Sequence, residues 1–336
     1  MLRTYPFPLQ LIYAGNSNGN VKLETSYVLK TLFFGESYPH VTKLVRKHRI
    51  DLIHLMDNYG PSQVALSRIS VPKTIFQLNY NPRYPFYSEL LKASLRPFDR
   101  VVTGSAALAR MLRESKAAPR TEAIPWAVAL SSVGYQSADY SGAKAHLGLK
   151  GKSIVVLWTG FLPLVGKREL LFSLRVAKQL VHRLPNIKFV FAFKSEHFVR
   201  EYKGLEHERI RIASLRSKTG LLQLASTCDV LFSPCLNDAA VFGPPLTWLE
   251  CMAQGLPIVT TSLPGIDEVV SNDANGIILP QPGQAQDALY QLVIDPERIA
   301  RLSIGARKNI GKRFEINSTA DAYERMWLSV LAHDRG

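Results

Sequence analysis

Apolar runs rich in β-branched residues alternate along the first half of this chain with stretches of helical spacing. The runs predict strands at residues 9–14, 50–56, 73–78, 100–105 and 122–126. Residues 38–48 and 106–115 instead place their apolar side chains at the period of an amphipathic helix. Ser105 precedes the second stretch and is a favourable N-cap residue, so the first half is predicted to be strands joined by helices.

The second half repeats this alternation after a segment rich in Ser, Gly and Ala at residues 127–150. Its apolar runs predict strands at residues 153–160, 187–193, 209–213, 229–234 and 257–261. Helices are predicted at residues 168–184 and 318–332, and Asp295-Pro296 is typical of a helix start. Strands that alternate with helices are characteristic of parallel sheets. The predicted fold class is therefore α/β, with two similar parallel-sheet layers that face a cleft.

The composition is that of a globular protein with two domains. The chain has 336 residues, of which 46% are hydrophobic and 20% are charged, so two cores can form and disorder is not expected. The longest apolar run, residues 154–165, is interrupted by Gly160 and Pro163 and is too short to cross a membrane. The start of the chain lacks the pattern of a secretory signal.

The three cysteines, Cys228, Cys235 and Cys251, are an odd number without the spacing of a zinc site. We interpret them as buried, reduced thiols, as is usual in the cytoplasm. The sequence therefore predicts a cytoplasmic protein without a metal site.

The net charge of +14 lies mostly in the first 135 residues, which carry 17 Lys or Arg against 8 Asp or Glu. A basic face attracts phosphates, anionic membranes or nucleic acid. No nucleic-acid-binding module is recognisable, so nucleic acid is not an expected partner. Two interpretations of the basic face remain. Either it binds an anionic membrane, which would make the protein peripheral on the inner membrane face, or it is merely solvated.

The most informative segment is FGPPLTWLECMAQG, at residues 242–255. Pro245 suits the first position of a helix, and Gly255 suits its end. The amino end of such a helix presents free N–H groups and a partial positive charge, which together favour an anion. Glu250 lies about one and a half turns further on, within reach of two neighbouring hydroxyls such as those of a ribose. This order predicts a nucleotide-sugar site.

Three stretches give the chain its resemblance to a known family. They are RVVTGSAALARMLRE followed by AIPWAV, then VVLWTGFLPLVGKRELL, and DVLFSPCLNDAAVFGPPLTWLECMAQGLPIVTTSLPGIDEVV. On these motifs the chain resembles the family-four glycosyltransferases, which implies the GT-B fold with two Rossmann-like domains. The implied acceptor domain is residues 1–130, which we expect to be incomplete, and residues 131–152 form a linker. The nucleotide-sugar domain is residues 153–312, and a helix at residues 313–336 can cross back to the first domain.

The resemblance also implies roles for individual residues. Glu250 matches the family's glutamate that holds the nucleotide ribose, and Lys167 matches, within one residue, the lysine that grips the donor diphosphate. The other implied nucleotide-sugar contacts are Gly160, Ile212, Leu215, Asp238, Pro245, Leu246 and Thr247. Two alternatives stay open, since Asp238 suits a turn and Lys167 suits a solvated helix start. Cationic and dipolar groups neutralise the leaving diphosphate in this family, so neither a metal nor a cofactor is expected.

The chain departs from the family pattern at three places. Phe242 stands where the family has an acid that contacts the donor sugar, and Phe161 stands where it has a phosphate-gripping arginine. Trp126-Ala127 replaces an asparagine–glycine pair. These departures leave open a non-catalytic GT-B protein that binds a nucleotide sugar or assists an active transferase.

Candidate acceptor contacts lie in the first half. His54 and Asp57 are at the carboxyl end of a predicted parallel strand, where open α/β sheets bind ligands. Asn79 and Tyr80 open a polar and aromatic loop after the next predicted strand. We predict these four residues as acceptor contacts, with a structural role as the alternative.

The predicted function follows from the motif and the resemblance together. A retaining transferase is expected to move a sugar from a UDP- or GDP-linked donor to a lipid-linked or polysaccharide-precursor acceptor. The departing phosphate is expected to take the acceptor proton, so no protein base is required. The open alternatives are the non-catalytic protein and another GT-B enzyme, such as a nucleotide-sugar epimerase.

Overall fold

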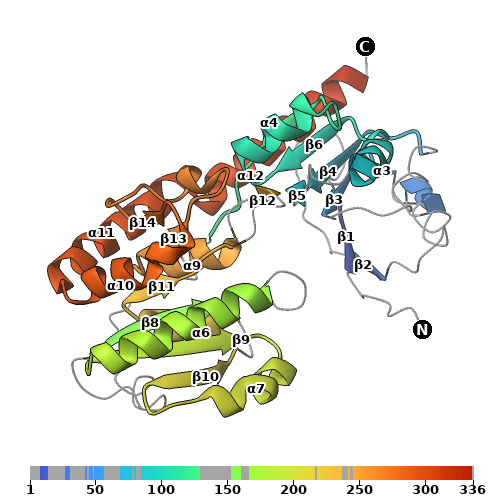
Figure 1. Ribbon diagram of the computed structural model, residues 1–336. Coiled ribbons are helices and arrows are strands. Elements are labelled where there is room, and N and C mark those ends of the chain that lie inside the picture. The colour runs from blue at the N-terminus through green and yellow to red at the C-terminus, as the bar shows by residue number, and fades with distance from the viewer. Residues whose placement is uncertain are drawn as a thin grey trace. The chain divides into compact units, whose positions relative to one another are not determined.

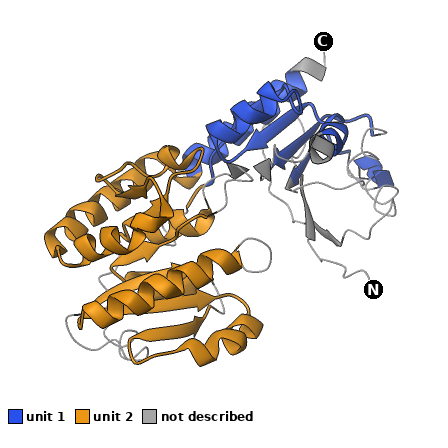
Figure 2. Cartoon of the chain, viewed as in Figure 1, with its two compact units in different colours: residues 1–126, 239–243, 317–336 blue, residues 127–238, 244–316 orange. Residues whose placement is uncertain are grey.

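The structure is a computed structural model that divides into two compact units (Figures 1 and 2). Unit 1 is Met1–Trp126, Ala239–Gly243 and Asn317–Gly336, and unit 2 is Ala127–Asp238 and Pro244–Ile316. The structure describes residues 8–13, 27–30, 42–43, 45–47, 49–56, 69–77, 79–80, 85–128, 153–159, 166–215, 218–236, 241–242 and 245–334. The expected linker at residues 131–152 lies outside the described residues, as do Asp57, Gly160 and Asp238.

Unit 1 is a sheet with helices on both faces and a small separate ribbon. Its strands are β1 (Pro8–Tyr13), β2 (Tyr27–Lys30), β3 (Ile53–Met56), β4 (Lys73–Gln77), β5 (Asn79–Tyr80), β6 (Arg100–Thr103), β7 (Thr121–Ala123) and β12 (Val241–Phe242). Its helices are α3 (Pro85–Leu95), α4 (Ala106–Glu114) and α12 (Ile316–Asp334). Of the helix expected at residues 38–48, residues 42–43 and 45–47 are helical.

The main sheet of unit 1 has the order β2-β1-β3-β4-β6-β7. From β3 to β7 it is parallel, as predicted, but β1 is antiparallel to both β2 and β3, so a wholly parallel sheet is a wrong prediction for this end. The apolar pattern identified the strand at residues 9–14 but cannot give its direction. β2 and β3 run in the same direction, and the helical residues 42–43 and 45–47 lie in the connection that such a crossover requires.

Two apolar layers cover the faces of this sheet. Because side chains alternate along a strand, Ile75 and Phe76 of β4 point to opposite faces. Ile75 packs with residues of α3 and α4, whereas Phe76 packs with Met326 and Val330 of α12. The N-cap prediction for α4 is confirmed, since the Ser105 hydroxyl accepts the Leu108 N–H at 3.0 Å.

Unit 2 contains a second six-stranded sheet, and its pairings are all parallel. Its strands are β8 (Ile154–Thr159), β9 (Ile187–Phe193), β10 (Ile210–Ser214), β11 (Val230–Phe232), β13 (Ile258–Thr261) and β14 (Gly276–Leu279). Its α-helices are α6 (Gly166–Arg183), α7 (Glu196–Tyr202), α8 (Lys218–Ser226), α9 (Leu246–Ala253), α10 (Ala285–Val293) and α11 (Pro296–Arg313). Single 3₁₀ turns are η3 (Lys203–Leu205), η4 (Ile266–Glu268) and η5 (Pro282–Gln284). Asp295 caps α11 by accepting the Arg298 N–H, which confirms the predicted helix start.

The strand order β10-β9-β8-β11-β13-β14 reverses its direction of growth between β8 and β11. The chain adds β9 and β10 on one side of β8, and then adds β13 and β14 on the other side of β11. Open α/β sheets bind ligands at the carboxyl ends of the strands beside such a switch point. The helices that start there are α6, after β8, and α9, after β11.

A two-stranded ribbon completes unit 1. β12 pairs with β5 in antiparallel register, with Val241 opposite Tyr80 and Phe242 opposite Asn79. The chain thus leaves unit 2 after Asp238 and returns to it at Pro244, directly before α9. None of the helices in the described ranges has the length and apolar character required to cross a membrane.

Candidate functional site

The amino end of α9 forms one side of the switch-point site. α9 begins at Leu246, so Pro245 occupies the N-cap and not the predicted first helical position (φ −60°, ψ 132°). The ψ angle of Pro245 is extended rather than helical, as is usual for an N-cap residue, and its carbonyl accepts the Trp248 N–H at 2.9 Å. The N–H groups of Leu246 and Thr247 belong to the first turn, where no helical carbonyl can receive them. The end is as predicted, because Gly255 has φ +91°.

Glu250 is buried in the middle of α9, with 5% of its surface exposed. Its neighbours Leu249 and Cys251 are fully buried. Burial, followed by the charges of Cys228 and Glu250, raises the pKa of the Cys251 thiol. Glu250 is therefore a carboxylate held inside the unit, two turns or less from the amino end of α9. Its role toward a ribose remains a prediction.

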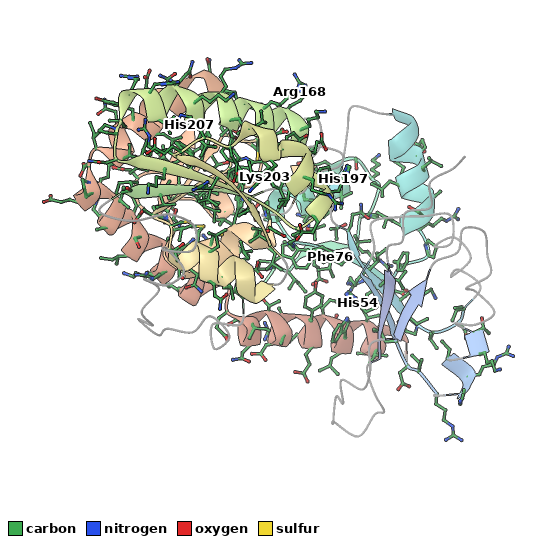
Figure 3. All side chains as sticks on the ribbon, turned by 90° about the horizontal axis from the view of Figure 1, so that it is seen from below. His54, Phe76, Arg168, His197, Lys203 and His207 are labelled. Atoms are coloured by element: carbon green, nitrogen blue, oxygen red, sulfur yellow. The ribbon has the colours of Figure 1, made fainter. Side chains whose placement is uncertain are left out.

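The amino end of α6 forms the other side of the site. Gly166 starts the helix, and Lys167 and Arg168 follow as exposed residues of the first turn. Arg168 projects outward from this end of α6 in Figure 3. Lys167 is thus free to turn toward a ligand at the carboxyl edge of the sheet, as the diphosphate role requires.

Glu169 is a site residue that the sequence analysis missed. Its side chain is only 9% exposed, and its Oε1 atom accepts the Leu236 backbone N–H at 3.2 Å. Its Oε2 atom is buried and has no hydrogen-bond partner among the described residues. The signal in the sequence was a carboxylate in the first turn of a helix that follows a Gly- and Pro-containing loop. A buried oxygen without a partner is costly, and this oxygen lies where a ligand is expected.

The segment after β11 connects the two sides. The Cys235 N–H donates to Thr261 Oγ1 at 2.9 Å, and the Thr261 hydroxyl donates back to the Cys235 carbonyl. Trp248 Nε1 donates to Ser233 Oγ at 2.9 Å, which ties this segment to α9. Together with the Glu169 contact, these bonds hold the segment between the starts of α6 and α9.

The three cysteines are free thiols, and two of them, Cys228 and Cys251, are buried as predicted. Cys235 differs, because it is only half-buried in the segment after β11. Burial of its sulfur, with a smaller contribution from Glu169, raises the pKa of the Cys235 thiol to about 11. Cys235 is therefore a neutral thiol at physiological pH.

The predicted contacts to the base lie on β10 and just beyond it. Ile212 and Leu215 are both 5% exposed. The Ile212 N–H donates to Glu206 Oε1 at 3.0 Å, and the Leu215 N–H donates to the Phe193 carbonyl at 2.7 Å. Burial raises the pKa of Glu206, but the bonds from Lys203 and Ile212 outweigh it and the net pKa is lowered. Both backbone N–H groups are thus occupied, which leaves side chains and carbonyls for a base.

The acceptor candidates of unit 1 are in two different settings. His54 is 1% exposed and lies between the sheet and α12 (Figure 3). Its ring meets those of Tyr323 and Trp327 edge to face, with centroids 5.4 and 5.5 Å away. Burial lowers its pKa to about 3, so the ring is neutral at physiological pH. This setting favours the structural alternative for His54, whereas Asn79 and Tyr80 form β5.

The structure brings one set of candidates together within unit 2. Lys167, Leu215 and Leu246 follow β8, β10 and β11 in the chain, and parallel strands bring these positions to one edge of the unit 2 sheet. The described part of the chain contains no group of three or more His, Cys, Asp or Glu side chains that could hold a metal ion. This edge combines helix dipoles, an ammonium group and buried carboxylates, which suits a ligand that carries both phosphates and hydroxyls.

Comparisons with known proteins relate unit 2 to a family of glycosyltransferases. Residues 153–295 match the family described as Glycosyl transferases group 1. D-inositol 3-phosphate glycosyltransferase of Saccharomonospora viridis is 26% identical over 217 residues, covering 60% of this chain and 49% of that protein. Spore coat protein SA of Bacillus subtilis is 24% identical over 292 residues, covering 80% of this chain and 76% of that protein. The match thus spans about half the length of the first of these relatives.

The fold of the chain is also similar to the folds of solved structures. HepE of Anabaena, determined in complex with UDP and glucose, superposes with a TM-score of 0.68 at 18% identity, covering 88% of this chain and 84% of that one. Two α/β units, one of them with a wholly parallel sheet, correspond to the GT-B fold. Residues 153–295 are therefore similar to the group 1 domain of glycosyltransferases, in agreement with the resemblance of the chain to the family-four enzymes.

Proposed function

We propose that this protein transfers a sugar, with retention at the anomeric carbon, from a UDP- or GDP-linked donor to a lipid-linked or polysaccharide-precursor acceptor. The observation that carries the proposal is the carboxyl edge of the unit 2 sheet, where the starts of α6 and α9 flank the switch point. The match of residues 153–295 to the group 1 family supports it. The UDP and glucose bound to HepE support a UDP-linked donor.

The residues of this edge divide the work of binding the donor. The N–H groups at Leu246 and Thr247 and the Lys167 ammonium group would receive the diphosphate, which leaves with its charge stabilised. Glu250 would accept hydrogen bonds from the ribose hydroxyls. The acceptor oxygen would form a bond to the anomeric carbon while the bond from that carbon to the donor phosphate breaks. The departing phosphate oxygen would take the proton of the acceptor hydroxyl. We therefore propose a reaction that needs no metal and no protein base.

We further propose that Ile212 and Leu215 contact the base, and that Gly160 and Asp238 contact the donor sugar. Asn79 and Tyr80, with Asp57, are proposed for the acceptor. A cytoplasmic location fits the free thiols Cys228, Cys235 and Cys251. The net charge of +14 supports peripheral binding to the inner membrane face.

The test is turnover of candidate donors with the purified full chain. UDP- and GDP-linked hexoses are incubated with lipid-linked acceptors, and the anomeric proton of the product is followed by NMR. The expected result is transfer with retained configuration, which Glu250→Gln reduces and the exposed-residue control Glu297→Gln does not. A folded protein that neither transfers nor hydrolyses any of these donors would contradict the proposal.

A second candidate is a GT-B protein that binds a nucleotide sugar without catalysis. The observation in its favour is the burial of His54 under α12, which removes a polar side chain from the acceptor side. Phe242, in β12 of the ribbon, is a further departure from an active site of this family. Donor hydrolysis that disappears in Glu250→Gln would exclude this candidate.

A further inference from the structure

A cavity at the amino edge of the unit 1 sheet has no place in the proposed reaction. It measures about 420 Å³ and lies between the end of α3 and the end of α4. Its walls include Asp99 and Arg120, which directly precede β6 and β7. In parallel α/β sheets the reacting ligands bind at the opposite, carboxyl edge. A second cavity of about 480 Å³ adjoins it and shares Asp99, Pro119 and Arg120.

The rim of this cavity is basic. Arg96, Lys116 and Arg120 line it, and all three side chains are exposed. Among the described residues, none of the three has an ion pair with a carboxylate. Asp99 is the one acid among the described residues of the wall, and its Oδ2 atom accepts the Lys73 backbone N–H at 2.7 Å.

Other cations nearby are already paired, which sets these three apart. Lys92 also lines the cavity, but its ammonium group lies 2.7 Å from Glu89. Arg100, at the neighbouring cavity, lies 3.2 Å from Glu122. The three cations therefore outnumber the single carboxylate of Asp99 in the wall, and such a concave surface with excess positive charge attracts anions.

The floor of the cavity is apolar. Leu95, Phe98 and Ala117 contribute to its wall and belong to the buried core of this face of the sheet. Cavities of about 300 to 1,000 Å³ with an apolar lining and a few convergent polar groups are typical ligand sites. A basic rim over an apolar floor suits an amphiphile with a phosphate head, since a free phosphate would make no use of the floor.

We propose that this amino-edge pocket binds the phosphate headgroup of an anionic membrane lipid and so attaches unit 1 to the bilayer surface. Each basic residue near such a surface strengthens binding about fivefold. This inference builds on the proposed function by naming the surface that meets the membrane. It needs no contact with the nucleotide-sugar site, because all its residues belong to unit 1.

The experiment is sedimentation of the full chain with vesicles of phosphatidylcholine alone or mixed equally with phosphatidylglycerol. The pocket variant replaces Arg96, Lys116 and Arg120 together with Gln. The control variant replaces Arg175, Lys178 and Arg200, which are exposed on α6 and α7 of unit 2, so that both lose the same charge. Wild type and control are expected to bind only the mixed vesicles. The pocket variant is expected to bind these vesicles about 100-fold more weakly than wild type does.

Three outcomes would overturn the inference. They are no binding of wild type to the mixed vesicles, equal loss in both variants, and binding of glycerol 3-phosphate in the pocket without vesicle binding. The last outcome would assign the pocket to a soluble phosphate ester. Nucleotide titration of all three proteins separates this test from the proposed function, because none of the replaced residues belongs to the donor site.

Discussion

The buried histidine of unit 1, His54, is expected to make the stability of that unit depend on pH. His54 is neutral in the folded protein down to about pH 3, because burial lowers its pKa to about 3. In the unfolded chain the pKa returns to about 6.5. Between these values the unfolded state binds one more proton than the folded state, so the unfolding free energy falls as the pH falls.

The magnitude follows from this linkage. Between about pH 7.5 and about pH 5, one such histidine removes about 2 kcal/mol of unfolding free energy. That is a large part of the stability of an ordinary domain. Replacing His54 with Gln removes this term, at the cost of the edge-to-face contacts with Tyr323 and Trp327. The variant is therefore expected to be less stable at neutral pH but less sensitive to acid.

Hydrogen exchange read by mass spectrometry measures this change for unit 1 alone. Amides of β3 and α12 report its unfolding free energy, after correction for the intrinsic effect of pH on exchange. Amides of unit 2 in the same sample are an internal control, and His182→Gln, at an exposed position of α6, is the matched variant. The reasoning about His54 is refuted if His54→Gln loses as much protection between the two pH values as wild type does.

Four further predictions concern the cap, the core and the site. Ser105→Ala removes the hydrogen bond to the Leu108 N–H and should lower the free energy of unfolding in urea by about 1 kcal/mol. The control Ser226→Ala, which is not at a helix N-cap, should change that free energy by about zero. Gly305→Ala would drive its Cβ into the carbonyl oxygen of Ala274 and should cost about 3 kcal/mol in the same assay, whereas a loss under about 0.5 kcal/mol would contradict that contact. Glu169→Gln should weaken nucleotide-sugar binding about tenfold by calorimetry, and unchanged binding would make its buried oxygen merely structural. Excess chelator should leave the transfer rate unchanged, and a rate restored only by Mg²⁺ would refute the metal-free proposal.

Much of unit 2 could be predicted from the sequence because its signals are local. The segment at residues 242–255 contains its own proline start and glycine end, and the structure places both within one residue of the prediction. The strand runs of unit 2 are continuous and apolar because both faces of a parallel sheet are covered. The apolar runs, together with the proline and glycine signals, were therefore sufficient to identify the strands of unit 2 and the helix that carries Glu250.

What the sequence did not predict depends on contacts between distant residues. β1 runs antiparallel to both of its neighbours, and the direction of a strand leaves no mark on its apolar pattern. His54 is covered by α12, more than 260 residues later in the chain, so its strand-end position alone suggested a ligand contact. Glu169 becomes notable only because the Leu236 N–H donates to one carboxylate oxygen, whereas the other oxygen has no hydrogen-bond partner among the described residues.

The central claim is that the carboxyl edge of unit 2 binds a nucleoside diphosphate sugar through α9 and Glu250. The most direct measurement is calorimetric titration of UDP, GDP and ADP into wild type, Glu250→Gln and the exposed control Glu297→Gln. We predict micromolar binding of one nucleotide, weakened at least tenfold, or about 1.4 kcal/mol, in Glu250→Gln and unchanged in the control. Folded protein that binds none of the three, or binds equally well without the Glu250 carboxylate, would contradict it.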